Sequence, residues 1–69
     1  MTGKDLQSIR IELGLTQREF AKLLGYEFQT ISAMERGREE IRVSFEKHVL
    51  AEKKLRDIRT LLEKSLNGM

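Results

Sequence analysis

The residues that could carry covalent or metal chemistry are few in this 69-residue sequence. It contains one histidine, His48, and no cysteine. Without cysteine, and with its single histidine among charged residues, the chain can assemble neither a Cys–His pair nor a Ser–His–Asp arrangement. No cluster of histidine and cysteine has the spacing of a metal site, and no glycine-rich phosphate loop occurs. The sequence therefore predicts no enzyme, no metal site and no cofactor.

Side chains that could instead bind a partner by hydrogen bonds are concentrated in residues 15–37, LTQREFAKLLGYEFQTISAMERG. Two short helices are predicted in this segment. Thr16 and Glu19 form a T-x-x-E capping box at the start of the first helix. Gly25 ends it, because glycine takes the left-handed conformation at no steric cost. The second helix covers residues 28–36. Helices this short are marginal alone, so the two must pack on each other.

This pair of helices resembles the helix-turn-helix of the phage repressor and Cro family, also called XRE-like. The resemblance depends on the pattern G-L-T-Q-x-E-x-A-x-x-L-G followed by T-I-S-x-x-E-x-G, and it extends over residues 6–38, a little under half of the chain. The family's proline after the third helix and its second glycine turn are both missing here. The last third of the chain must therefore be interpreted from its own residues.

The resemblance implies that the second helix of the pair reads base edges in the major groove of DNA. The amide of Gln29 offers a donor and an acceptor that match adenine N6 and N7. The ring of Phe28 could contact a thymine methyl group, fold back onto the core, or meet a protein partner. Thr30 and Ser32 could donate hydroxyl hydrogen bonds to bases or phosphate, and Ala33 could contact a methyl group.

Phosphate contacts around the reading helix are a second implication of the resemblance. Gln17 matches the phosphate-binding glutamine of the family, and backbone N–H groups at that helix N-terminus would support the contact. The cations that could reach the DNA backbone are Arg18, Lys22, Arg36, Arg38 and Arg42. The chain has 13 basic and 11 acidic residues and a net charge of only +2. Local geometry, rather than overall charge, must therefore favour nucleic acid.

An ion pair between Arg10 and Glu35 is also implied by the resemblance. A guanidinium can meet a carboxylate through two parallel hydrogen bonds, which fix orientation as well as distance. The expected role of this pair is structural, because it would hold the reading helix at its angle to the first helix.

The elements that position these residues are predicted to be helices throughout, since the chain contains no proline. A first helix is expected over residues 4–13, after a frayed start at residues 1–3. Together with the two short helices it forms a three-helix core over residues 1–42. Within this core Tyr26 is expected to be buried against Ile31.

A long C-terminal helix is predicted over residues 43–66, with Ser44 as its cap. No glycine or proline interrupts this part of the chain before Gly68, which is expected to end the helix. Phe45 and Val49 lie on one side of it and are expected to cover the core.

A second apolar surface of that helix has steps of four, three and four residues, the spacing of a heptad seam. The residues of this seam are Ala51, Leu55, Ile58 and Leu62. We expect the seam to form a homodimer interface, because so much exposed apolar surface is rare on a monomer. The alternative is that the helix bends near residues 52–54 and folds back over its own seam.

These observations predict one all-α domain over residues 1–69, a compact lambda-repressor-like helix-turn-helix domain with a long C-terminal helix. The predicted function is that of a sequence-specific double-stranded DNA-binding transcriptional regulator, in the form of a repressor that binds a palindromic operator as a homodimer. No apolar run is long enough for a membrane span, and the N-terminus lacks a signal-peptide core. A cytoplasmic protein without membrane partners is expected.

Two other functions remain open. The chain could be an antitoxin-like interaction module, in which the C-terminal helix binds a toxin and DNA binding is secondary. It could also be a module that kept the fold but lost DNA binding, since Glu27, Glu39 and Glu40 would repel phosphate.

Overall fold

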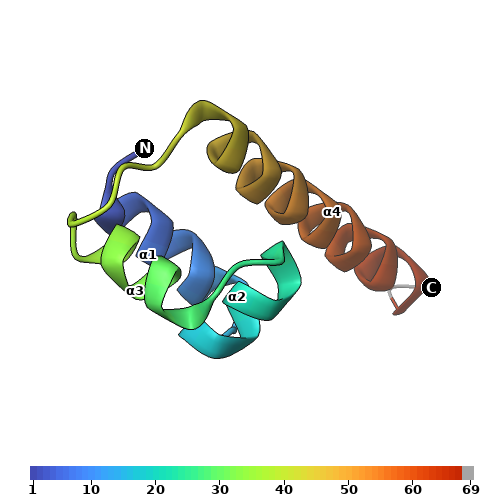
Figure 1. Ribbon diagram of the computed structural model, residues 1–69. Helices are drawn as coiled ribbons and strands as arrows, with labels where there is room; N and C mark the ends of the chain where they lie inside the picture. Colours follow the sequence, from blue (N-terminus) through green and yellow to red (C-terminus); the bar gives the residue numbers. More distant parts are fainter. Residues whose placement is uncertain (68–69) are drawn as a thin grey trace.

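The computed structural model describes residues 1–67, and within that range the chain is helical and has no strand (Figure 1). The elements are α1 (Gly3–Glu12), α2 (Gln17–Leu24), α3 (Phe28–Glu35) and α4 (Val43–Asn67). The predicted all-α helix-turn-helix domain with a long C-terminal helix is confirmed. The predicted stop at Gly68 lies outside the described residues. Within residues 1–67, no helix has the length and apolarity that crossing a membrane requires.

Each of the three short helices is followed, within two residues, by a glycine whose φ lies between 73° and 77°. After α2, the N–H of Gly25 donates to the carbonyl of Lys22, and the N–H of Tyr26 donates to the carbonyl of Ala21. This pair of bonds defines a Schellman motif, and it recurs after α1 and after α3. The left-handed glycine stops each helix after ten residues or fewer and satisfies carbonyls that the helix leaves unpaired.

Two of the short helices also begin in the same way. In α2 the Thr16 hydroxyl accepts the N–H of Glu19, whose carboxylate accepts the N–H of Thr16. Thr2 and Asp5 form the same reciprocal box at the start of α1. The bond from the threonine backbone holds the pKa of each carboxylate below its ordinary value. Both boxes therefore stabilise the fold above the ordinary carboxylate pKa values and lose that contribution as the pH falls through the lowered ones.

The prediction of a frayed start at residues 1–3 is wrong, because this segment packs closely on α3. A Cβ on Gly3 would lie 2.5 Å from the carbonyl oxygen of Met34 and 2.6 Å from that of Glu35. Both distances are too short for real non-bonded atoms. The first turn of α1 thus approaches the last turn of α3 to a distance that only glycine permits.

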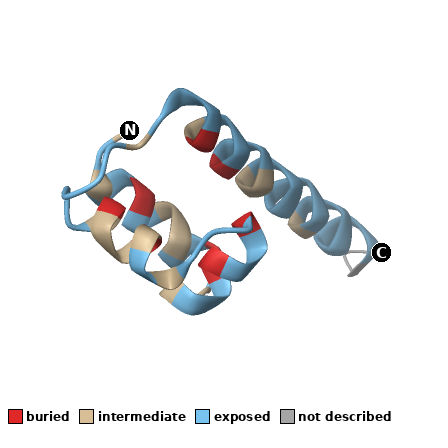
Figure 2. Cartoon of the chain, in the orientation of Figure 1, coloured by how far each residue is buried: buried red, intermediate tan, exposed pale blue. Residues whose placement is uncertain are grey.

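A single core lies between the four helices (Figure 2). Its buried residues are Leu6, Leu13, Phe20, Ala21, Leu24, Ile31, Met34, Phe45 and Val49. The expected burial of Phe45 and Val49 against the short helices is confirmed, so α4 completes the core rather than only extending from it. The expected burial of Tyr26 is wrong. Its ring is 42% exposed and meets the ring of Phe45 edge-on, with centroids 4.9 Å apart.

The long helix α4 is uninterrupted over its 25 residues, so it does not fold back near residues 52–54 (Figure 1). It begins at Val43, where the carbonyl of Arg42 accepts the first helical N–H bond, from Glu46. Ser44 is therefore inside the first turn and is not the cap, contrary to the prediction.

Halfway along α4, a second set of contacts joins it to the end of α1. The Arg56 guanidinium donates to the carbonyl of Leu13 at 3.0 Å, and Lys53 Nζ lies 3.7 Å from a carboxylate oxygen of Glu12. A cation near the last carbonyls of a helix is favourable for the helix dipole. Beyond these contacts α4 extends past the three short helices (Figure 1).

Replacement of Gly3 by alanine tests the close approach of α1 and α3. Alanine is the better helix former, so the change should stabilise the protein if the site were open. We expect instead a loss of about 1–3 kcal/mol in the free energy of unfolding, because the added methyl group displaces the backbone of α3. Urea denaturation measures the loss, with Lys4→Ala on the exposed side of the same turn as the control. A Gly3→Ala variant as stable as the wild type would contradict the packing described.

Candidate nucleic-acid interface

A hydrogen-bonded ion pair fixes the relative positions of the three short helices. Arg10 Nε donates to one carboxylate oxygen of Glu35 at 2.8 Å, and Arg10 Nη2 donates to the other at 3.2 Å. The remaining Arg10 nitrogen, Nη1, donates to the carbonyl of Leu15 at 2.9 Å. The side chains of Arg10 and Glu35 are only 13% and 4% exposed. This two-pronged geometry connects α1 with the last residue of α3 and with the turn that precedes α2.

Gln17 contributes a further bond to the same network, and no local sequence pattern predicts that bond. Its Nε2 donates to a carboxylate oxygen of Glu35 at 3.1 Å. The amide hydrogen-bonds α2 to α3 and is therefore directed inward, not free for a phosphate. The backbone N–H groups of Gln17 and Arg18 remain at this helix terminus, since the capping box satisfies the next donor along the chain, that of Glu19. These N–H groups are what α2 can offer to an anion.

The exposed face of α3 carries most of the residues predicted to read bases. Ile31 and Met34 are buried and fix the orientation of the helix. Gln29 is exposed, and Ser32 and Ala33 are partly exposed. At about 100° per residue these three side chains share one side of α3, opposite the core. Arg36 directly follows α3 and lies on the same side of the helix axis as these three residues. Thr30 is partly exposed and lies at the edge of this face.

Phe28 and Arg18 take positions that the sequence did not predict. Phe28 neither enters the core nor stands free, because the guanidinium of Arg18 lies over its ring at 4.4 Å from the centroid. This cation–π contact joins the first turn of α2 to the first residue of α3. The structure thus brings together one residue predicted to read bases and one predicted to bind phosphate.

The other predicted phosphate ligands occupy two separate regions. Arg36, Arg38 and Arg42 are exposed at the end of α3 and in the segment that leads to α4. Two exposed carboxylates, those of Glu39 and Glu40, lie in the same segment, which therefore carries both cations and anions. Lys22 is apart from these arginines, on the last turns of α2. The N-cap of α3 is Glu27, whose side chain makes no cap hydrogen bond.

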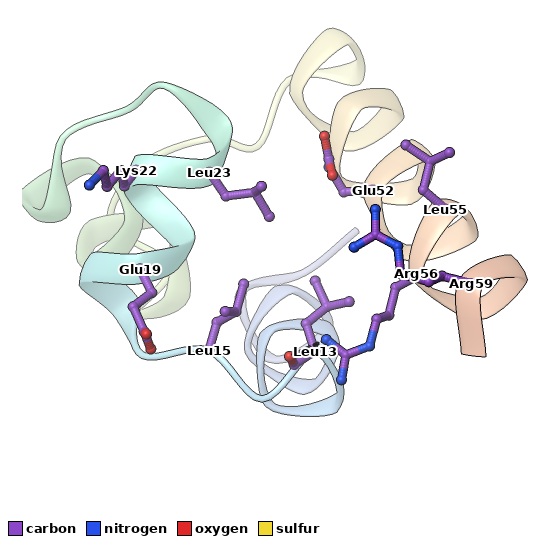
Figure 3. Close-up of a pocket in the computed structure, with 9 residues that line it drawn as sticks. All are labelled: Leu13, Leu15, Glu19, Lys22, Leu23, Glu52, Leu55, Arg56 and Arg59. Atoms are coloured by element: carbon purple, nitrogen blue, oxygen red, sulfur yellow. Dashed lines mark hydrogen bonds between the residues drawn. The ribbon is translucent and has the colours of Figure 1, made fainter. Parts of the chain in front are cut away.

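A groove of about 520 Å³ separates α2 from the middle of α4 (Figure 3). We call it the α2–α4 groove, and its lining residues are Leu13, Leu15, Glu19, Lys22, Leu23, Glu52, Leu55, Arg56 and Arg59. Leu13, Leu15 and Leu23 point into it from the α1–α2 side. Leucines and charged side chains of both signs line it, so the groove is a mixed apolar and charged surface. Residues 1–67 contain no group of acidic or histidine side chains that could hold a metal ion.

The predicted seam of α4 is exposed along its whole length. Leu55, Ile58 and Leu62 are 57%, 49% and 60% exposed, and Ala51 is exposed as well. At about 100° per residue the seam lies roughly 130° around the helix from the side that packs on the core. The contacts that join α4 to the short helices thus leave the seam uncovered.

Comparison with known proteins gives one result. A protein-family model described as helix-turn-helix matches residues 6–47, more than half of the chain. The match continues past Arg38, the limit of the resemblance seen in the sequence, and includes the first turn of α4. No curated protein and no solved structure matched the chain.

Replacement of Arg10 and Glu35, singly and together, tests the ion pair. Arg10→Met leaves the carboxylate of Glu35 almost fully buried without its cation, and we expect a loss of about 3–5 kcal/mol in the free energy of unfolding. The double variant Arg10→Met/Glu35→Leu should lose much less than the sum of the single losses. Urea denaturation of the four proteins measures the coupling. Arg10→Lys keeps the charge but not the two-pronged geometry, and it should fall between wild type and Arg10→Met. Additive losses in the cycle would show that the two side chains do not act as a pair.

Proposed function

Because the chain belongs to the XRE-type helix-turn-helix family, we propose that it is a transcriptional regulator that binds a specific double-stranded DNA site and reads the major groove with α3. The observation that carries this proposal is the exposed face formed by Gln29, Ser32, Ala33 and Arg36. An α-helix fits the major groove, where each base pair presents a distinct pattern of donors and acceptors. The buried side of α3 holds the helix, so its outer side is available for bases.

Each base-reading residue has a definite chemistry in this proposal. Gln29 donates to adenine N7 and accepts from adenine N6. The hydroxyl groups of Thr30 and Ser32 hydrogen-bond to base edges or phosphate, and the methyl group of Ala33 contacts a thymine methyl. Phe28 has one face covered by Arg18, so only its other face and its edge can reach a thymine methyl.

The DNA backbone is held on both sides of α3. The free backbone N–H groups of Gln17 and Arg18 at the start of α2 bind one phosphate. Lys22, on the last turn of the same helix, reaches the backbone separately. Arg36, Arg38 and Arg42 bind the backbone beyond the end of α3. Contacts to phosphate set the register of the protein on the duplex and carry no direct sequence information.

We further propose that two copies bind a palindromic operator as a homodimer through the seam of α4. The exposed Leu55, Ile58 and Leu62 support this assembly, since monomers rarely leave such a continuous apolar surface in water. Two-fold dimers of this motif place their reading helices about 34–36 Å apart, one turn of DNA. A repressor is the form of regulator that these two surfaces favour, because occupancy of an operator is enough to block transcription. Its place of action is the cytoplasm.

The reading face can be tested with a binding site selected from a random duplex library. Gln29→Ala should weaken binding to that site by about 1–3 kcal/mol and relax the preference at one base pair of each half-site. Arg36→Ala should instead weaken all sequences alike and reduce the slope of log K against log salt. Fluorescence anisotropy with single-base variants of the site measures both. If Gln29→Ala left every base preference intact, α3 would not read DNA in the way proposed.

Dimerisation can be tested by sedimentation equilibrium at tens of micromolar protein. The wild type should be a dimer, and Ile58→Glu should convert it to a folded monomer, because a charge at the centre of the seam opposes burial. Thr60→Glu changes the net charge equally on the opposite side of α4 and should leave the dimer intact. A monomeric wild type would contradict the proposal. It would favour the alternative of an antitoxin-like module, in which a partner protein such as a toxin covers the seam.

A further inference from the structure

The proposed function uses the stack of Arg18 on Phe28 only as a limit on how Phe28 can approach DNA. The guanidinium carbon of Arg18 lies 4.4 Å from the centre of the ring. Phe28 is the first residue of α3, directly before the proposed adenine-reading Gln29. Arg18 is exposed, so its charge is available to a ligand that approaches α3.

The guanidinium carbon lies over the ring, and a cation–π contact restrains the group without using its hydrogen-bond donors. Among residues 1–67, no ion pair engages Arg18, in contrast to Arg10. The contact therefore leaves a restrained, unpaired two-donor edge beside the reading helix.

A phosphate places a looser demand on the plane of the guanidinium. Its oxygens accept hydrogen bonds from many directions, and a lysine can also hold a phosphate as a point charge. A guanine base is more demanding. Its O6 and N7 lie in the plane of the base, and an arginine reads both only when its two donors lie close to that plane.

Gln17 gives a second reason to assign Arg18 to bases. The neighbouring Gln17 donates its amide inward to Glu35, so it is held away from the bases. Arg18 is then the side chain at the start of α2 that can extend toward the groove, and Phe28 joins it to the helix that enters the groove.

We propose that Arg18 is a base-reading residue that recognises guanine through O6 and N7, and that Phe28 is a positioning residue that holds the guanidinium in the required plane. This assignment rests on the proposed function, since it presumes that α3 enters the major groove. It replaces the expectation that Arg18 binds phosphate. The guanine occupies a base pair of each half-site other than the one that Gln29 reads.

The test begins with selection of a binding site by the wild-type protein from a random duplex library. Arg18→Lys keeps the charge and removes the two-donor edge. It should bind the selected site roughly 5- to 100-fold more weakly and lose the preference for guanine at one position. Its affinity for a site in which that guanine is replaced should equal that of the wild type. Arg36→Lys is the matched control. A lysine still binds phosphate as a point charge, so any change in affinity should be the same for every sequence and the base preference should be kept.

Two variants of the ring test the role of Phe28. Phe28→Leu removes the aromatic platform and should reduce the preference at the same guanine position as Arg18→Lys does. Phe28→Tyr keeps the ring and should retain the preference. Thermal melting of each variant confirms that it is folded at the assay temperature, because the stack itself contributes only modestly to stability at an exposed site.

Other results would overturn the proposal. If Arg18→Lys bound the selected site like the wild type, or if Arg18→Ala weakened all sequences alike, Arg18 would be a phosphate ligand or a purely structural contact. The proposed function would still stand in that case, because the wild type would retain its selected site. A wild-type protein that enriches no sequence would overturn the proposed function, and with it the role of Arg18.

Discussion

The arrangement of the short helices depends on the pair formed by Arg10 and Glu35. Glu35 is the last residue of α3, where the helix dipole is unfavourable for a carboxylate. The position is tolerable because three donors from Arg10 and Gln17 surround the two carboxylate oxygens. Loss of any donor would leave negative charge at the wrong end of a helix and largely out of water. The same contacts set the angle of α3, so the reading face is oriented by a network that lies behind it.

Local sequence patterns predicted several helix boundaries, although Ser44, also a local signal, is not the cap of α4. The box of Thr16 and Glu19 predicted the start of α2, and Gly25 predicted its end. A box of Thr2 and Asp5 was present in the same form but was missed, because aspartate replaces the usual glutamate and the segment was expected to fray. Its signal could have been found by the same rule.

Interactions between distant segments could not be predicted from local patterns. Tyr26 has the spacing of a core residue, yet its partner is Phe45, which α4 places beside it from much later in the sequence. The role of Gly3 depends on the approach of two helix ends, and nothing near it in the chain indicates that contact. The stack of Arg18 on Phe28 likewise needs the angle between α2 and α3. Arg10 and Glu35 were identified in advance because the family resemblance, rather than their spacing, joined them.

The attachment of α4 has a mechanical consequence. The helix is held in the core by its first two turns and by Arg56 on the end of α1, and about 16 Å of it extends beyond that last contact. A rod supported at one end acts as a lever. A tilt of about 10° around Arg56 would displace its free end by about 3 Å. A partner held by the part of the seam beyond Arg56, at Ile58 and Leu62, would therefore move by up to that distance while the reading face of α3 stayed in place.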